Sequence, residues 1–204
     1  SAFTSRYKRE VLNEGNSDSV TAAFFGDGTC NNGQFFECLN MAQLWKLPII
    51  FVVENNKWAI GMAHDRATSD PEIWRKAEAF GMKGEEVNGM NVLSVRAATQ
   101  RALNRARAGE GPTLLECLTY RYRGHSLADP DELRAKEEKE FWAQKDPLKQ
   151  LEKDLISNSI ATESELRSIE KEIDKEVIDS VDFAINAAEP SSEELTKYIW
   201  AEDV

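Results

Sequence analysis

Two short polar motifs near the start of the chain carry groups that suit a phosphate and a metal ion. The first is Gly26-Asp27-Gly28 and the second is Asn55-Asn56, with the 26 positions from 29 to 54 between them. A diphosphate needs its charge neutralised, and magnesium binds carboxylate and amide oxygens readily. Asp27 and Asn56 are therefore candidate magnesium ligands, and the glycines allow the backbone to approach an anion closely.

The residues around these motifs predict a strand, a helix and a second strand. The apolar run VTAAFF at 20–25 predicts a buried strand, and IIFVVE at 49–54 predicts another. Between them a helix should begin near Gly33, where its first N–H groups would face a bound anion. Parallel strands joined in this way bind ligands at their carboxyl ends, which brings Asp27 and Asn56 close together. The helix has apolar residues at mostly helical spacings: Phe36, Leu39, Met41 and Leu44.

A simpler interpretation treats the first motif as a tight turn and the second as a loop tip. The complete order of strand, spacer, strand and paired asparagines favours a metal and phosphate site instead. The phosphate signatures GxGxxG and GxxxxGK followed by Ser or Thr are both absent from the chain. The sequence thus supports neither a dinucleotide-binding Rossmann site nor a P-loop.

Composition and charge exclude several classes of protein. Acidic residues outnumber basic ones 36 to 25, and the formal net charge of −11 repels nucleic acid backbones. The 3 cysteines have no CxxC spacing, which favours a reducing compartment over a disulfide framework or a zinc site. No apolar run approaches the roughly 20 residues that span a bilayer, and the first residues lack the pattern of a signal peptide. We expect no nucleic acid partner and no membrane insertion.

Further helices are predicted downstream. Asp70-Pro71 should cap and begin a helix in PEIWRKAEAF, and Asn91 should cap a helix that stops at Gly109. Residues 112–120 predict another strand.

The last third of the chain combines a loop and helices. Residues 121–138 are polar and turn-rich without periodicity, which predicts an exposed functional loop. From Asp146 onward the pattern is helical, and Thr162 with Glu165 forms a possible capping box.

Together these elements indicate an α/β fold with a parallel sheet flanked by helices. We expect an α/β domain at residues 1–140 and a helical extension packed on it at 141–204. One strand at 20–25, preceded by about one helix, leaves few strands for a doubly wound fold, where about five or six are usual. The remaining strands are expected upstream or from another chain.

Two stretches resemble a known family. The run FFGDGTCNNGQFFECLNMAQLWKLPIIFVVENNKWAIGM at 24–62 and the run GPTLLECLTYRYRGHSLADPDELR at 111–134 resemble the alpha subunits of pyruvate dehydrogenase-type 2-oxo acid decarboxylases. The glycine and asparagine motifs match that family's thiamin diphosphate fingerprint. The resemblance continues to about residue 200. It implies a thiamin-diphosphate-binding fold with thiamin diphosphate and Mg²⁺ as cofactors.

The resemblance assigns roles to individual residues. It makes Asp27 and Asn56 the side-chain magnesium ligands and the carbonyl of Trp58 the third protein ligand. The family more often has tyrosine at this last position, a change that a main-chain ligand tolerates. Gly28 and Thr29 would contact the diphosphate.

The second stretch corresponds to a loop beside the cofactor. His125 matches the loop histidine, which could donate a hydrogen bond or transfer a proton near the diphosphate, whereas His64 has no such context. Ser126 matches the serine that mitochondrial enzymes phosphorylate, but the following ADPDELR has no second serine, which favours a bacterial or plastid origin. The loop also contains three arginines: Arg121, Arg123 and Arg134. They could pair with the acidic residues Asp129, Asp131 and Glu132 of the same loop, with a lipoyl domain, or with water alone.

The resemblance also implies a reaction and partners. Pyruvate would be decarboxylated and its acetyl group passed to a lipoyl acyltransferase, in an α2β2 assembly whose beta subunit supplies the activating glutamate. The chain would be the C-terminal portion of the alpha subunit, located in the bacterial cytoplasm or the plastid stroma. Alternatives are a branched-chain 2-oxo acid or acetoin dehydrogenase alpha subunit, a transketolase-like enzyme, and an inactive assembly domain.

Overall fold

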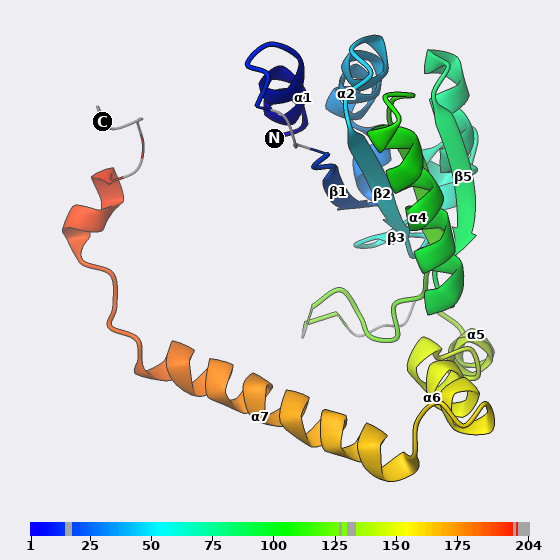
Figure 1. Cartoon of the computed structure of the whole chain (residues 1–204). Coiled ribbons are helices and arrows are strands. Elements are labelled where there is room, and N and C mark those ends of the chain that lie inside the picture. Colours follow the sequence, from blue (N-terminus) through cyan, green and yellow to red (C-terminus); the bar gives the residue numbers. More distant parts are fainter. Residues whose placement is uncertain (15–17, 127, 130–133, 198, 200–204) are drawn as a thin grey trace. The chain divides into compact units, whose positions relative to one another are not determined.

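The computed structural model describes residues 1–14, 18–126, 128–129, 134–197 and 199 (Figure 1). The chain divides into two compact units, Ser1–Leu151 and Glu152–Val204. The first unit contains the sheet. Its elements are α1 (Ala2–Glu10), β1 (Thr21–Gly26), the 3-10 helix η1 (Asp27–Asn31), α2 (Gly33–Leu44), β2 (Ile49–Asn55), β3 (Trp58–Ala59), β4 (Met62–Ala63), α3 (His64–Ala67), the 3-10 helix η2 (Ile73–Phe80), β5 (Lys83–Asn88), α4 (Val92–Arg107), β6 (Thr113–Leu118) and α5 (Lys136–Ala143).

The described residues form a sheet of four parallel strands in the order β1-β2-β6-β5. The register places Gly26 opposite Glu54, so β1 and β2 end side by side. Asn55 lies opposite Leu118 at the end of β6. The α/β fold with a parallel sheet flanked by helices is confirmed, and the carboxyl ends of three strands meet where both polar motifs begin.

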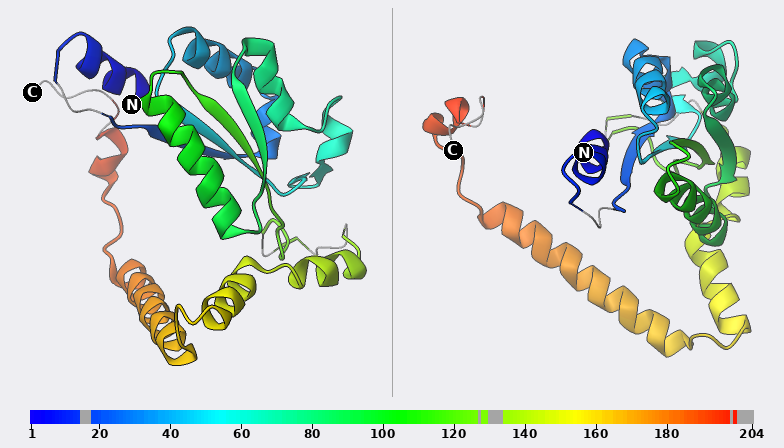
Figure 2. Two further views of the ribbon diagram at one scale, coloured as in Figure 1. Left: turned by 45° about the vertical axis from the view of Figure 1, so that its right-hand side comes forward. Right: turned by 45° about the horizontal axis from the view of Figure 1, so that its top comes forward.

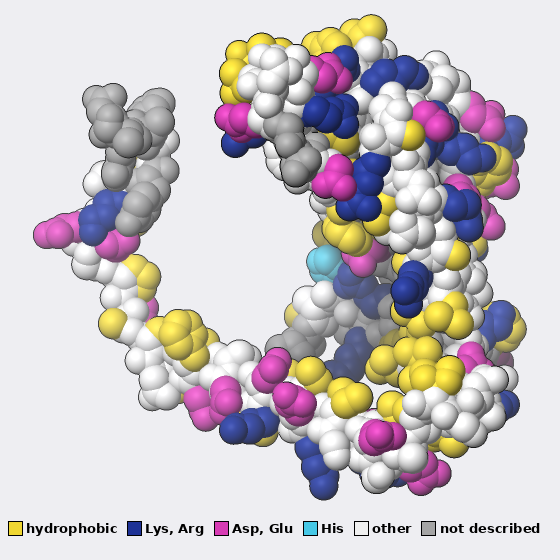
Figure 3. Space-filling model, viewed as in Figure 1, with side chains coloured by type: hydrophobic (Ala, Val, Ile, Leu, Met, Phe, Trp, Pro, Cys, Tyr) yellow, Lys and Arg dark blue, Asp and Glu magenta, His cyan; other side chains and the backbone are white. Residues whose placement is uncertain are grey.

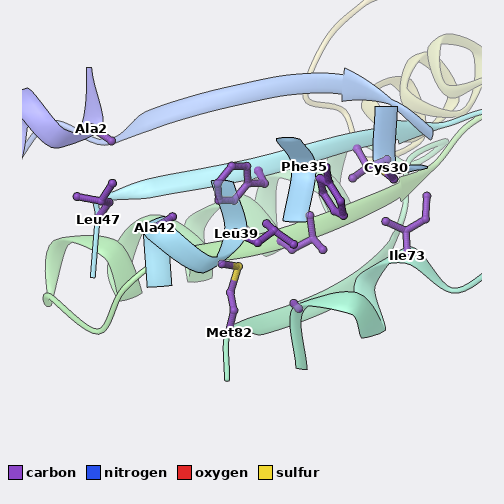
Figure 4. Packing of buried hydrophobic residues seen from close by; sticks show 12 residues of the cluster. Ala2, Cys30, Phe35, Leu39, Ala42, Leu47, Ile73 and Met82 are labelled. Carbon is purple, nitrogen blue, oxygen red and sulfur yellow. The ribbon is translucent and has the colours of Figure 1, made fainter. Parts of the chain in front are cut away.

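Helices cover both faces of the sheet (Figure 2). One face packs against α2 and η2, and this cluster includes Phe35, Leu39 and Leu114 (Figure 4). The opposite face packs against α4, whose Ala98 and Ala102 are buried. Successive strand residues alternate between the two faces because side chains in a strand point to opposite sides. The site at the strand ends therefore rests on a sheet that is packed on both sides.

Several helix starts agree with the sequence. Asn32 caps α2 by accepting a hydrogen bond from Gln34 N at 3.0 Å, and the helix begins at Gly33 as expected. Asn91 caps α4 by accepting from Ser94 N at 2.8 Å. The capping box of Thr162 and Glu165 is present at the start of α7 (Glu163–Asn186). Local side-chain chemistry was sufficient to predict these starts.

One predicted helix start was wrong, and the spacing of apolar residues did not reveal the buried side of another helix. Asp70-Pro71 does not begin a helix: η2 starts at Ile73 and is a 3-10 helix, while Asp70 Oδ1 accepts a hydrogen bond from Glu72 N at 3.0 Å. α2 buries only one, Leu39, of the four apolar residues noted at helical spacings. Its buried residues are Phe35, Leu39 and Ala42, whereas Phe36, Met41 and Leu44 are exposed.

β5 was absent from the sequence-based prediction. Its sequence KGEEVN is polar, with only Gly84 and Val87 buried, so it lacks the apolar pattern that identifies a strand. Gly84 is required there, because a Cβ atom would lie 2.0 Å from the carbonyl oxygen of Trp74. β5 enlarges the sheet on the side of β6. At the other edge, β1 exposes alternate residues, including Phe24.

The second unit is helical. It contains α7 (Glu163–Asn186) and the 3-10 helix η3 (Ser192–Thr196), and the unit boundary falls inside α6 (Pro147–Ser157). Hydrophobic and acidic side chains both lie along α7 (Figure 3). No residue of α7 is buried. Among the described residues, no helix combines the length and the apolarity needed to cross a membrane.

Candidate functional site

Asp27 lies at the first position of η1, directly after β1, and is only 2 % exposed. Burial raises the pKa of its carboxyl group, because an ionised oxygen loses its hydration there. The main-chain N–H groups of Asp27 and Asn56, the neighbouring ring of His64 and the positive charge of Arg121 oppose this rise. Asp27, which directly follows β1, is thus in contact with Asn56 in the turn that follows β2.

That turn spans residues 55–58 and is built by its two asparagines. Asn55 Oδ1 accepts a hydrogen bond from Lys57 N at 2.8 Å, and Asn56 Oδ1 accepts from Trp58 N at 3.1 Å. Lys57 has φ 65°, a left-handed conformation that turns the chain sharply. The turn leads into the hairpin of β3 and β4. Asp27 and Asn56 are therefore brought to one end of the sheet, as the spacing predicted, and Trp58 lies in the same turn.

Gly28 lies where the hairpin comes closest to η1. A Cβ atom at this position would be 2.8 Å from the Cβ of Ala59. Any larger residue would push η1 and β3 apart. Thr29, the next residue, is exposed. The contacts proposed for both residues with a diphosphate remain predictions.

His64 is a neighbour of Asp27 that the sequence interpretation missed. Its ring is 5 % exposed, and Nδ1 lies 3.7 Å from Asp27 Oδ2. Nε2 lies 3.0 Å from the carbonyl oxygen of Pro71. A carbonyl only accepts hydrogen bonds, so Nε2 carries the proton and Nδ1 faces the carboxylate. A single histidine in a polar segment gives no sequence signal for this contact, which only the tertiary structure creates.

The donor set fits a small hard cation. Asp27 Oδ2 is buried and accepts no hydrogen bond from any described residue. Such an atom is costly to bury, and a divalent cation would replace the missing donor and favour the ionised carboxylate. Asn56 adds a neutral oxygen from the adjacent turn. Carboxylate and amide oxygens are the ligands that Mg²⁺ prefers. The residues present thus suit a magnesium-bound phosphate group.

The loop after β6 brings the second predicted segment towards Asp27. Arg121 is close enough for its charge to favour the ionised form of Asp27. Arg121 Nη1 donates to His125 Nδ1 at 3.3 Å, which leaves Nε2 of a neutral ring as the protonated nitrogen. The main-chain N–H of His125 donates to Asp129 Oδ2 at 2.7 Å. His125 itself is exposed, so its proton-bearing nitrogen is open to a ligand.

Other parts of this loop have defined contacts. Arg134 donates to the main-chain oxygen of Arg121, and its guanidinium lies 5.5 Å from the centre of the Tyr120 ring. Ser126 is exposed, and its main-chain oxygen accepts from Asp129 N at 3.1 Å. Asp131 and Glu132, which were considered as partners of the loop arginines, lie outside the described residues.

Comparison with known proteins places the chain in a family. The model of the dehydrogenase E1 component family matches residues 7–193. The chain belongs to this family. E1 components in general depend on thiamin diphosphate, in agreement with a site that suits a metal-bound phosphate.

Curated relatives of this E1 component chain carry a consistent name. It is 59 % identical over 202 residues to "Pyruvate dehydrogenase E1 component subunit alpha" of Porphyra purpurea, covering 99 % of this chain and 59 % of the relative. It is 62 % identical over 201 residues to the chloroplastic subunit alpha-3 of Arabidopsis thaliana, covering 98 % of this chain and 47 % of the relative. A bacterial relative from Rhizobium meliloti is 45 % identical over 195 residues, covering 95 % of this chain and 54 % of the relative. The chain spans about half the length of the curated relatives it matches.

Proposed function

We propose that this chain is the metal- and diphosphate-binding part of a pyruvate dehydrogenase alpha subunit. The whole protein would catalyse the thiamin-diphosphate-dependent oxidative decarboxylation of pyruvate and transfer the acetyl group to a lipoyl acyltransferase. The observation that carries this proposal is the buried Asp27 Oδ2, which accepts no hydrogen bond from the described residues and lies beside the 55–58 turn. The similarity to chloroplastic and bacterial pyruvate dehydrogenase subunits supports the choice of substrate.

Each residue of the site has a defined part in this proposal. Asp27, the side chain of Asn56 and the carbonyl of Trp58 hold Mg²⁺, and the main chain at Gly28 and Thr29 contacts the diphosphate. The close approach of β3 to Gly28 keeps η1 and the turn together. Bound thiamin diphosphate supplies the thiazolium carbon that attacks the 2-oxo acid and accepts electrons during decarboxylation.

His125 acts at the entrance of the site. Because Arg121 donates to Nδ1, a neutral ring presents Nε2–H as a hydrogen-bond donor. This group would donate to the diphosphate or give a proton to the incoming lipoyl sulfur. Arg121 holds the ring and also contributes positive charge near Asp27.

The proposal includes partners that complete the site. The catalytic glutamate would come from a beta subunit in an α2β2 assembly, and residues 141–204 would form a helical extension on the α/β domain at 1–140. A bacterial cytoplasm or a plastid stroma is the proposed location, since both bacterial and chloroplastic relatives exist.

The test is decarboxylation and acetyl transfer by the complete alpha subunit assembled with its beta subunit, thiamin diphosphate and Mg²⁺. Pyruvate should be turned over faster than a branched 2-oxo acid. Asp27→Asn should abolish turnover. Asp65→Asn, the same change at an exposed residue next to His64, should retain it. Turnover by Asp27→Asn at the parent rate would refute the assignment of the metal site.

A further inference from the structure

Glu116 is a buried carboxylate that the proposed reaction does not use. It lies on β6, near the centre of the sheet, and is 1 % exposed. Oε1 accepts a hydrogen bond from Asn55 Nδ2 at 2.6 Å, and Oε2 accepts from Trp74 N at 2.9 Å. Each oxygen of this one carboxylate therefore binds an N–H group from a different segment. One segment is the end of β2, and the other is the start of η2.

The contact with Asn55 fixes the orientation of an amide group. Asn55 directs its NH₂ group towards Glu116, because Nδ2 is the donor and Oε1 the acceptor in this bond. The amide oxygen then faces the opposite way, where it accepts from Lys57 N at 2.8 Å. That bond forms the first half of the 55–58 turn. The main-chain oxygen of Asn55 also accepts from Thr119 N at 2.9 Å, which ties the turn to the end of β6.

A second contact joins the same region to the metal site. Residues 71–74 bind Glu116 through Trp74 N and bind His64 Nε2 through the carbonyl of Pro71. His64 in turn faces Asp27. Glu116, Asn55, Trp58 and His64 all line one cavity of about 390 Å³. The buried carboxylate thus contacts the turn through Asn55 and borders the same cavity as Trp58 and His64.

We propose that Glu116 is a positioning residue that holds the 55–58 turn in the conformation that presents Asn56 and Trp58 to the metal. It acts through Asn55 and does not touch the metal or the cofactor. The inference rests on the proposed metal site. It also gives the first asparagine of the Asn55-Asn56 pair a separate role: Asn55 builds the turn, and Asn56 provides the ligand.

Glu116→Gln removes one interaction while keeping the size of the side chain. Glutamine has one acceptor oxygen in place of two, so only one of the N–H groups of Asn55 and Trp74 keeps its partner. The matched control is Glu86→Gln. Glu86 lies opposite Glu116 in the register of β5 and β6, is exposed, and undergoes the same loss of charge.

The experiment measures binding of Mn²⁺ by electron paramagnetic resonance, in the complete alpha subunit assembled with its beta subunit and saturated with thiamin diphosphate. Glu116→Gln should raise the apparent Kd for Mn²⁺ about tenfold or more, and excess metal should restore turnover. Glu86→Gln should bind Mn²⁺ like the parent. The thermal midpoint of each metal-free protein is measured in parallel.

Asn55→Ala provides an independent route if Glu116→Gln does not fold. It removes the acceptor for Lys57 N but leaves Glu116 bonded to Trp74 N, and it should weaken Mn²⁺ binding to a similar extent. If both single variants fold, the double variant Glu116→Gln with Asn55→Ala should have a Kd for Mn²⁺ no higher than that of the single variant that binds Mn²⁺ more weakly. The two effects should not add, because both residues act through the same turn.

The outcomes separate the two proposals. If the parent protein binds no Mn²⁺ with thiamin diphosphate present, the proposed metal site itself is refuted. If the parent binds Mn²⁺ and Glu116→Gln binds it equally well, the positioning role is refuted even when the thermal midpoint falls. Equal Mn²⁺ binding by Asn55→Ala and the parent also refutes it.

Discussion

The two segments that form the candidate site are held in place by different means. At the ends of β1 and β2, Asp27 and the turn at 55–58 lie against a buried histidine and a closely packed hairpin. The loop after β6 is exposed around His125 and is held by Arg121 and Asp129. The first segment is fixed by the core of the sheet, and the second by contacts within the loop.

This difference indicates that the buried segment serves cofactor binding and the exposed loop serves the reaction. A metal site gains affinity when its ligands are already in place, because no ordering cost is then incurred on binding. A group that exchanges protons with an incoming substrate must instead be accessible. We therefore expect changes in the buried segment to alter cofactor binding and changes in the loop to alter the rate of turnover.

Outside the proposed metal ligands, the largest expected effect concerns His125. His125→Ala should lower acetyl transfer roughly a hundredfold, which is typical of losing a group that transfers protons. Mg²⁺ binding should stay near the parent value, since His125 is exposed and contacts Arg121 instead of the metal ligands. Rates and binding are measured on the same assembled protein. A rate restored by His125→Gln would indicate hydrogen bonding in place of proton transfer, and a rate unchanged in His125→Ala would refute the role.

The next effect concerns Gly28 in the buried segment. Gly28→Ala should weaken thiamin diphosphate binding roughly tenfold, because the new Cβ would lie 2.8 Å from the Cβ of Ala59 and overpacking costs about 1–3 kcal/mol. Gly33→Ala is the control, since a Cβ there has no neighbour within 4 Å. Calorimetric titration distinguishes the two variants. Equal affinities for both would show that η1 and β3 adjust freely.

A smaller effect concerns the stability of the metal-free protein as a function of pH. Burial raises the pKa of Asp27 in the folded protein above the ordinary carboxyl value of 3.8. The stability that Asp27 contributes is therefore fully present below pH 3.8 and is lost as the pH rises through the raised pKa of the folded protein. Asp27→Asn should therefore become more stable relative to the parent as pH rises from about 4 to about 7. Glu116, whose pKa is also raised by burial, is present in both proteins and cancels in the comparison.

Urea unfolding of both proteins across this pH range provides the measurement. A stability difference that does not change with pH would contradict the conclusion that burial raises the pKa of Asp27.

The smallest effect concerns thiol reactivity. Burial, together with the charges of Asp27 and Glu116, raises the pKa of Cys30 to about 12, and burial raises that of Cys117 to about 11. Cys38 is exposed on α2. In the folded protein iodoacetamide should modify Cys38 and spare the other two, as determined by peptide mass spectrometry. Modification of Cys30 at the rate of Cys38 would show that the segment around Asp27 opens readily.

Much of the site could be predicted from the sequence because its signals are local. The spacing of the glycine and asparagine motifs matches one strand, one helix and one returning strand, and the register of β1 and β2 confirms that arrangement. The caps at Asn32 and Asn91 are also local, since each asparagine accepts from an N–H two or three residues further along the chain.

What the sequence did not reveal depends on contacts between distant segments. β5 is polar and is recognisable as a strand only by its pairing with β6. His64 acquires its role from Asp27 and Pro71, and Glu116 acquires its role from Asn55, which is 61 positions away. The buried side of α2 could not be predicted from the sequence, because helical spacing alone does not show which side faces the sheet.

The central claim is that the buried Asp27 holds one oxygen, Oδ2, without a hydrogen-bond donor among the described residues and ready to bind a divalent cation. It is tested most directly by titrating thiamin diphosphate calorimetrically into the complete alpha subunit with its beta subunit, with and without Mg²⁺. We predict binding by the parent only when Mg²⁺ is present, and no measurable binding by Asp27→Asn under either condition. Binding of thiamin diphosphate by Asp27→Asn with the affinity of the parent would contradict the account.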